Sequence, residues 1–193
     1  MAKLYFKYGA MNSGKSTILL QTAHNYEERG MKVLVIKPSI DLKDNNQVSS
    51  RLGIKRQVDY LISPTDNIIN KLINLENISC ILVDEAQFLT PYQVDELMKI
   101  TIIYDIPVIC YGLRTDFKSK GFQGSTRLLE IAHNIEEMRT ICRCGEKAIF
   151  TARFLNNKRV EEGEQVAIDG LQNITYESMC PKCFYQNKLK LKK

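Results

Sequence analysis

The first candidate for chemistry in this sequence is a glycine-rich segment near its start. Residues 9–16 fit the pattern GxxxxGK[ST], between a strand-like and a helix-like run. Glycines let the backbone curl so that N–H groups point toward phosphate oxygens, and the N-terminus of the next helix adds positive field. In such a loop Lys15 reaches the terminal phosphates and the Ser16 hydroxyl binds Mg²⁺. The alternative is an incidental glycine-rich turn. The expected nucleotide-binding residues are Gly9, Ala10, Met11, Asn12, Ser13, Gly14, Lys15 and Ser16.

An acidic pair follows an apolar run farther along the chain. Asp84 and Glu85 come directly after the strand-like residues 79–83. A carboxylate at the end of a strand could hold Mg²⁺ through water, as a Walker B aspartate does, which gives Asp84 a role. Glu85 would face the terminal phosphate or the incoming nucleophile and act as a base. The alternative is that the negative charges of both acids only stabilise the N-terminus of the helix that begins near Thr90.

The six cysteines fall into two classes. Cys80 and Cys110 lie inside apolar runs, where a free cysteine behaves as a small hydrophobic residue. The other four form a CxC and a CxxC pair, namely Cys142 with Cys144 and Cys180 with Cys183. Four thiolates in two close pairs fit a tetrahedral structural Zn²⁺ site, which leaves no open position for a substrate. A redox CxxC or four unrelated thiols are the alternatives.

These residues must be positioned by elements that alternate along the chain. The expected strands are 4–8, 32–37, 79–83, 107–111 and 138–141, and the expected helices are 15–29, one opening at 63–64, one opening at 90–93 with a capping box, and 126–133. Such alternation predicts βαβ units and an α/β fold with a parallel sheet covered by helices. Residues 41–57 are polar and show no periodic pattern of apolar residues, so they are expected to form a loop. In the first strand Leu4, Phe6 and Tyr8 alternate with Lys3, Tyr5 and Lys7, which is unusual for a central parallel strand.

The pattern changes near residue 141. Cysteine pairs, short β-like pieces at 148–155 and 164–168, and turn signals at 156–157 and 169–170 predict a small β-rich appendage. We therefore expect a nucleotide-binding domain over residues 1–141 and a zinc-binding domain over residues 142–193. A region of about fifty residues cannot build much of a core alone, which makes stabilisation by a metal physically reasonable.

Composition limits the remaining function classes. The chain has 193 residues, of which 44% are hydrophobic and 25% charged, and this is typical of a globular protein. No apolar run approaches the ~20 residues of a membrane helix, and the start lacks the apolar region of a signal peptide, so we expect a cytoplasmic protein without a membrane partner. The net charge of +5 comes largely from a lysine-rich tail. The nearly neutral body argues against a nucleic-acid partner.

Several motifs together resemble the cytosolic-type (type II) thymidine kinases, and the CxC pair is similar to that of bacterial members. The matching segments are GAMNSGKS (9–16), SIDLKDNNQVSSRLG (39–53), DEAQF (84–88), GLRTDFKSKGFQGS (112–125), TICRCGEKA (140–148), EEGEQVAIDG (161–170) and TYESMCPKC (175–183). They run through almost the whole chain in the family's order. The resemblance implies a P-loop (RecA-like) parallel-sheet domain followed by a β-rich domain that holds structural Zn²⁺.

The resemblance also implies a reaction. ATP would donate its γ-phosphoryl group to the 5′-hydroxyl of thymidine, or of deoxyuridine, with Mg²⁺. Glu85 would take the hydroxyl proton, while Lys15 and Asp84 stabilise the transferring group and the metal. Asp41 and Gln87 would join the ATP site. A homotetramer and feedback inhibition by thymidine triphosphate are further implications of the family.

A nucleoside pocket is implied by the same resemblance. The side chains that match it are Met11, Phe88, Leu113, Phe117, Phe122 and Tyr176. A lasso loop would hold the base mainly through backbone groups, and it matches Val166, Ala167, Ile168, Asp169 and Gly170. Without the resemblance, these aromatic residues would be interpreted as ordinary core packing.

A different class of protein is the main alternative. DEAQ could act as a helicase-type Walker B motif in a P-loop ATPase module whose zinc ribbon binds nucleic acid. The nearly neutral body and the lack of a second motor domain oppose this hypothesis. A kinase for another small metabolite is a third possibility.

Overall fold

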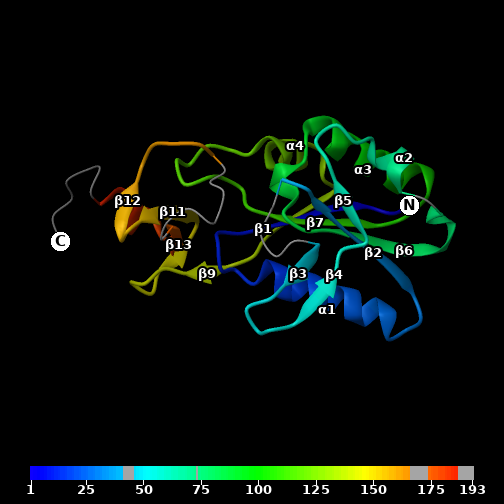
Figure 1. Ribbon diagram of the computed structural model, residues 1–193, viewed down its shortest axis with the longest axis horizontal. Coiled ribbons are helices and arrows are strands. Elements are labelled where there is room, and N and C mark those ends of the chain that lie inside the picture. The colour runs from blue at the N-terminus through cyan, green and yellow to red at the C-terminus, as the bar shows by residue number, and fades with distance from the viewer. Residues whose placement is uncertain (41–45, 73, 166–173, 187–193) are drawn as a thin grey trace.

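A six-stranded parallel sheet organises the larger part of the molecule (Figure 1). The computed structural model describes residues 1–40, 46–72, 74–165 and 174–186. The strand order is β5-β2-β6-β7-β1-β8, and every neighbouring pair runs parallel. The strands are β1 (Leu4–Tyr8), β2 (Lys32–Pro38), β5 (Tyr60–Ile62), β6 (Ile78–Val83), β7 (Val108–Gly112) and β8 (Asn134–Glu137). The predicted α/β fold with a parallel sheet is confirmed.

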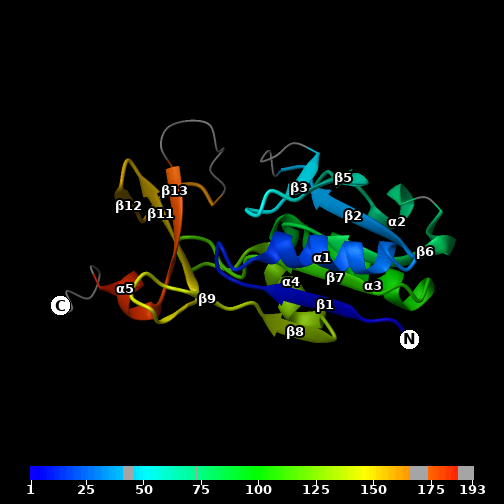
Figure 2. The ribbon, with the colours of Figure 1, turned by 90° about the horizontal axis from the view of Figure 1, so that it is seen from below.

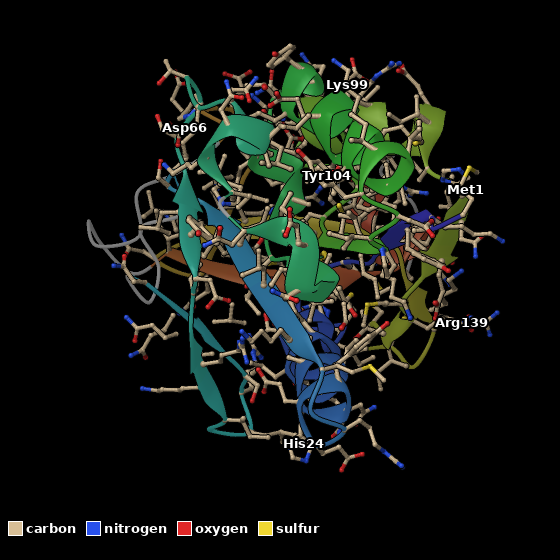
Figure 3. All side chains as sticks on the ribbon, turned by 90° about the vertical axis from the view of Figure 1, so that its right-hand side faces the viewer. Met1, His24, Asp66, Lys99, Tyr104 and Arg139 are labelled. Carbon is tan, nitrogen blue, oxygen red and sulfur yellow. The ribbon has the colours of Figure 1, made fainter. Side chains whose placement is uncertain are left out.

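Helices cover both faces of this sheet. Helix α1 (Lys15–Glu27) lies on one face, and α2 (Ile68–Lys71), α3 (Pro91–Ile103) and α4 (Gln123–Ile131) lie on the other. Figure 3 shows the two layers, with His24 of α1 on one side and Lys99 of α3 on the opposite side. Successive side chains of a strand point to opposite faces of the sheet, so the core has two parts. Val35 packs in the cluster of α1, whereas Ile36 packs in the cluster of α3. Buried strands that are apolar on both faces therefore require both layers.

The alternating first strand is explained by its place in the sheet. Leu4 and Phe6 are fully buried on the α3 side. Tyr5 and Lys7 face the other side, where they line an open hollow of about 530 Å³ beside β8. Lys7 pairs there with Glu136 at 2.9 Å. A strand next to the sheet edge can therefore carry lysine on the face that is not covered.

Several sequence expectations about elements of the larger region were wrong. The last strand of the sheet is β8, because a polar edge strand gives no apolar signal; residues 138–141 hold only the short β9 (Thr140–Ile141). The helix expected from 63–64 begins only after Asn67, whose side chain caps it by accepting from the Asn70 N–H. Within the expected loop 41–57, β3 (Gln47–Ser49) and β4 (Lys55–Gln57) form a hairpin, which buries Val48 in the cluster of α1. By contrast, the capping box at Thr90 is present.

A smaller β-rich region follows β8 and lies at the end of the molecule opposite the N-terminus (Figure 2). It contains β9 paired with β10 (Lys147–Ala148), a sheet of β12 (Lys158–Val160), β11 (Phe150–Leu155) and β13 (Ile174–Met179), and α5 (Pro181–Tyr185). The predicted turn at 156–157 is confirmed, since both asparagines have positive φ angles, 48° and 62°. The strand expected over 164–168 is wrong for Glu164 and Gln165, which are irregular, and 166–168 lie outside the described residues.

Each region has its own core. Phe184, Ala152 and Met179 pack in a cluster with two cysteines, separate from the two clusters of the parallel sheet. Two short 3₁₀ turns, η1 (Leu75–Asn77) and η2 (Ala86–Phe88), flank β6. Among the helices that the structure describes, none is long and apolar enough to cross a membrane.

Candidate active site

The glycine-rich loop lies between β1 and α1, at the carboxyl edge of the parallel sheet. Its residues from Met11 to Ser16 line a cleft of about 580 Å³ together with Asp84 and Glu85. The structure thus brings the loop and the acidic pair to one place, as the sequence predicted for them. This placement follows from topology, because the carboxyl ends of parallel strands meet at one edge.

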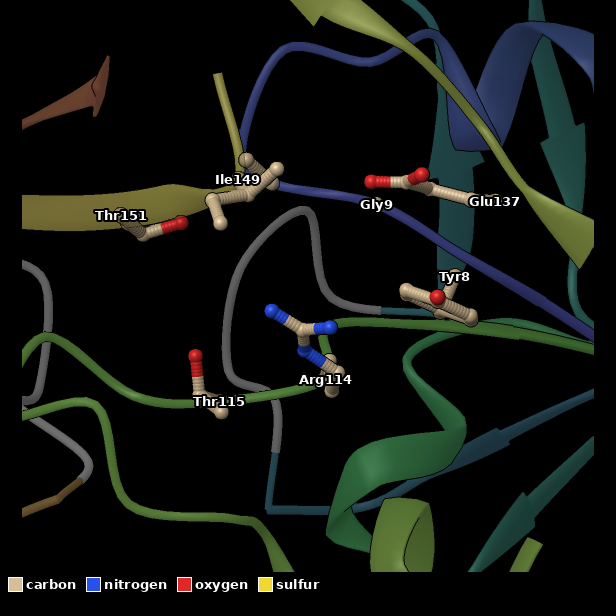
Figure 4. Close-up of a pocket in the computed structure, with 8 residues that line it drawn as sticks. Tyr8, Gly9, Arg114, Thr115, Glu137, Ile149 and Thr151 are labelled. Carbon is tan, nitrogen blue, oxygen red and sulfur yellow. The ribbon is translucent and has the colours of Figure 1, made fainter. Parts of the chain in front are cut away.

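Gly9 and Ala10, the first two residues of the loop, do not line this cleft. They line a cavity of about 10 Å³, roughly the space of one water. Figure 4 shows Arg114 pointing into this cavity between Tyr8 and Thr151. A Cβ atom on Gly9 would lie 2.3 Å from the Ser13 Oγ atom and 2.6 Å from a main-chain oxygen. Only glycine, which has no Cβ atom, therefore fits at position 9 in this backbone conformation.

Lys15 is buried in the loop that it belongs to. Its ammonium group donates to the Ala10 carbonyl at 3.0 Å and lies 3.4 Å from the Ser13 hydroxyl. Burial lowers the pKa of Lys15, while the nearby Glu85 and Asp84 carboxylates oppose this shift. A lysine held among carbonyl and carboxylate oxygens is placed to meet the negative charge of a phosphate.

The acidic pair occupies the turn directly after β6. Asp84 is buried, and its N–H bonds to the Ile36 carbonyl at 3.0 Å, which fixes the turn to β2. Glu85 adopts a left-handed conformation with a φ angle of 48°. This conformation is uncommon for a residue with a long side chain and is often found at functional sites. The pair and the Ser16 hydroxyl offer hard oxygen ligands in one cleft, the donor set that suits Mg²⁺.

Gln87 connects this turn to the neighbouring strand. Its side-chain nitrogen donates to the Glu85 carboxylate, and its side-chain oxygen accepts from the Leu113 N–H at 3.1 Å. The Gln87 side chain is 1% exposed and does not line the cleft. The structure therefore places Gln87 behind Glu85, whereas the resemblance had assigned it to the ATP site.

The aromatic residues of the expected nucleoside pocket form two groups. Phe88 and Phe122 pack edge to face, with ring centroids 5.6 Å apart. Phe117 lies instead against Arg153, whose guanidinium is 3.8 Å from the ring centroid. Arg153 also donates to the Tyr176 hydroxyl at 3.1 Å, so Phe117 and Tyr176 are joined through one side chain.

Arg153 is a residue that sequence reasoning missed. Besides its aromatic contacts, it donates to the carbonyls of Glu164 at 2.9 Å and Gln165 at 3.0 Å. The one signal in the sequence is a charged residue inside the β-like run FTARFL. Lys37 was also missed: it ends a strand-like run, yet its side chain is buried and lines the cleft.

Part of the expected site cannot be placed. Asp41, expected at the ATP site, lies outside the described residues. So do the five lasso residues Val166, Ala167, Ile168, Asp169 and Gly170.

The four paired cysteines converge in the smaller region. Their sulfur atoms all lie within 4.8 Å of one another, and the sulfurs of Cys144 and Cys180 are 3.6 Å apart. A tetrahedral Zn²⁺ with Zn–S distances of about 2.3 Å places its sulfurs about 3.8 Å apart. This cluster could therefore hold a metal ion such as zinc. Cys80 and Cys110 are fully buried in the sheet, as expected of small hydrophobic residues.

Comparison with known proteins agrees with this geometry. The profile of the thymidine kinase family matches residues 2–184. A thymidine kinase of Shewanella oneidensis is 50% identical over 95% of this chain and 97% of its own length. The thymidine kinase of Mannheimia succiniciproducens is 47% identical over 99% of this chain and 99% of its own length. That of Enterobacteria phage T4 is 46% identical over 94% of this chain and 95% of its own length. The phosphate loop, the acidic turn and the cysteine cluster therefore belong to a member of the thymidine kinase family.

Proposed function

We propose that this protein is an ATP-dependent thymidine kinase that transfers the γ-phosphoryl group of ATP to the 5′-hydroxyl of thymidine. The observation that carries the proposal is the meeting of Lys15, Asp84 and Glu85 at one cleft beside the phosphate loop. Family membership supplies the substrates. Phosphoryl transfer depends chiefly on positioning and charge stabilisation, which this residue set can provide.

On the ATP side, the loop from Gly9 to Ser16 would surround the phosphates with main-chain N–H groups. Lys15 would reach the oxygens of the transferring group. The Ser16 hydroxyl and the Asp84 carboxylate fit Mg²⁺, which when bound neutralises the charge that develops on the phosphates. Asp41 remains proposed for this side on the resemblance alone.

On the nucleoside side, Glu85 would act as the general base. As the 5′-oxygen forms its bond to the γ-phosphorus, the bond to the bridging oxygen breaks and ADP leaves. The Glu85 carboxylate takes the hydroxyl proton. Gln87 would orient that carboxylate through its hydrogen bond. The left-handed backbone at Glu85 supports this role, because strained residues gather at functional sites.

The base and sugar would lie among the two aromatic groups described above. Met11, Phe88, Leu113, Phe117, Phe122 and Tyr176 are the proposed contacts. Their apolar surfaces would exclude water from the reaction. The lasso residues Val166, Ala167, Ile168, Asp169 and Gly170 are proposed to hold the base through backbone groups, on the resemblance alone.

The direct test is an ADP-release assay with thymidine, with single-stranded DNA and with neither, followed by mass spectrometry of the nucleoside product. We expect ADP release only with thymidine and formation of thymidine monophosphate. Stimulation by DNA without nucleoside phosphorylation would favour the ATPase hypothesis. A panel that includes deoxyuridine and other nucleosides measures the breadth of the pocket.

Four further features belong to the proposal. Structural Zn²⁺ would occupy the cysteine cluster, in a second domain that begins near residue 142. Metal analysis of the purified protein tests for the zinc.

A homotetramer is tested by mass photometry. Feedback inhibition is tested by adding thymidine triphosphate to the kinase assay. A cytoplasmic location is tested by fractionation of cells that express the full chain.

A further inference from the structure

Two hydroxyl groups of the smaller region hold one residue of the phosphate loop. Thr151 on β11 accepts a hydrogen bond from the Met11 N–H at 3.1 Å. Ser178 on β13 donates a hydrogen bond to the Met11 carbonyl. Thr151 and Ser178 are directly opposite each other in the ladder of β11 and β13. Both main-chain groups of Met11 are therefore bonded to a single cross-strand pair.

The pair is buried at the contact between the two regions. Thr151 and Ser178 are 4% and 6% exposed. Buried polar groups need partners, and here the partners of the two hydroxyls include the loop backbone. A third contact lies close by, where the Thr140 hydroxyl is 3.4 Å from the Asn12 carbonyl. Asn12 itself has a left-handed backbone, with a φ angle of 64°. The smaller region thus contacts the loop where its backbone turns.

The orientation of this backbone matters for binding. A phosphate loop works through main-chain N–H groups, whose directions are set by the conformation of a few residues. Met11 follows directly on Ala10, whose carbonyl accepts from the Lys15 ammonium group. Fixing Met11 therefore also restrains the residue that holds the lysine.

Ser178 belongs to the chain segment that leads into the cysteine cluster. Ser178 lies two residues before Cys180 on the same chain segment. The next residue, Met179, packs with Cys142 and Cys180 in the core of the smaller region, and its carbonyl accepts from the Ile149 N–H at 3.0 Å. The packing of Cys142 and Cys180 with Met179 therefore connects the cysteine cluster to the strand that carries Ser178.

We propose that Thr151 and Ser178 form a hydroxyl clip, a pair of positioning residues through which the cysteine-held region fixes the phosphate loop for ATP. This inference rests on the proposed function. Coupling between two sites is reciprocal, so a metal in the cluster strengthens ATP binding and bound ATP retains the metal. The clip is not proposed to touch ATP.

The test compares hydroxyl removal with hydroxyl retention. The double variant T151V/S178A removes both bonds, whereas T151S/S178T keeps both hydroxyls. Thr175→Val is the matched control, since Thr175 is an exposed hydroxyl residue on β13. The affinity for Mg²⁺–ATP is measured by calorimetry without nucleoside, and the metal content of each variant is measured in parallel.

We expect the valine–alanine variant to bind ATP about tenfold or more weakly while keeping the metal content of the wild type. The hydroxyl-retaining variant and Thr175→Val should stay within about threefold of the wild type. Unchanged ATP affinity in T151V/S178A would overturn the clip, provided that the wild type binds ATP. A wild type that binds no ATP and phosphorylates no thymidine would instead refute the proposed function, and the clip with it.

A second measurement covers the case in which the double variant does not fold. The metal affinity of the wild type is measured by equilibrium competition with a chromogenic chelator, with and without Mg²⁺–ATP. Because the coupling is reciprocal, we expect bound ATP to raise the metal affinity about tenfold. The single variants Ser178→Ala and Thr151→Val should each reduce this gain. Equal metal affinities with and without ATP in the wild type would contradict the clip.

Discussion

Gln87 donates a hydrogen bond from its side-chain amide to the carboxylate of Glu85. The same amide accepts from the Leu113 N–H at 3.1 Å, so the acidic turn is fixed to the end of β7. Gly112 makes this approach possible, because a Cβ atom there would lie 2.8 Å from the Gln87 side-chain oxygen. The orientation of the proposed base is therefore set by a buried amide that does not line the cleft.

Replacing Gln87 tests this orientation. Gln87→Leu removes both bonds, and a hydrogen bond to a charged group contributes roughly 1.5–3 kcal/mol. We expect kcat to fall by roughly 10- to 100-fold, measured as thymidine monophosphate formed. A wild-type kcat in Gln87→Leu would show that the amide does not position Glu85.

Gln87→Glu gives a second test, because a carboxylate at this buried position has no N–H to donate to Glu85. Two carboxylates this close repel each other, so the Glu85 side chain should leave its orientation. We expect kcat to fall at least as far as in Gln87→Leu, and a wild-type kcat in Gln87→Glu would contradict the expected contact.

Glu85→Gln tests the base itself. The amide keeps the shape of the side chain but cannot accept the proton, and general base catalysis contributes typically 10²- to 10⁴-fold. We expect kcat to fall by about this factor while ATP affinity, measured by calorimetry, stays within about threefold. Glu76→Gln is the matched control, because Glu76 is an exposed acid in η1. Undiminished turnover in Glu85→Gln would exclude Glu85 from the mechanism.

Arg153 offers a test of the nucleoside side. Its planar guanidinium lies on Phe117 and bonds to Tyr176 and to two main-chain carbonyls, a set that a lysine cannot reproduce. For Arg153→Lys we expect the KM for thymidine to rise about tenfold, with little change in the KM for ATP. Arg143→Lys serves as the control, since Arg143 is exposed. Equal rises in both KM values would indicate a general loss of structure instead.

Metal removal should separate the two classes of cysteine. After treatment with a chelator and an alkylating reagent at pH 8, we expect alkylation of Cys142, Cys144, Cys180 and Cys183. Their sulfurs would no longer bind a shared metal ion and would become reactive. Burial raises the pKa of Cys80 to about 12 and also raises that of Cys110, so few of their thiolates exist at pH 8. Mass spectrometry of the alkylated peptides distinguishes the sites. Rapid alkylation of Cys80 in the folded protein would contradict this expectation.

Local patterns were sufficient for the parts of the site that are continuous in the chain. The loop at 9–16, the acidic pair after an apolar run and the capping box at Thr90 each depend on neighbouring residues, and each lies where the sequence placed it. The weak predictions concern elements whose stability comes from distant contacts. The polar β8 exists because it pairs with β1, and the hairpin of β3 and β4 because Val48 packs under α1.

Short patterns in the chain therefore specify the chemical groups that are available: a phosphate loop, a pair of carboxylates and four thiols suited to a metal. Tertiary structure decided which groups support that chemistry. Gln87 meets Glu85, Arg153 meets Phe117, and Thr151 with Ser178 holds Met11. The first contact lies within the motif DEAQF, and the bond from the Leu113 N–H to Gln87 fixes it in place. The other contacts join residues far apart in the chain, so no local spacing encodes them. They form only when the smaller region packs against the larger one.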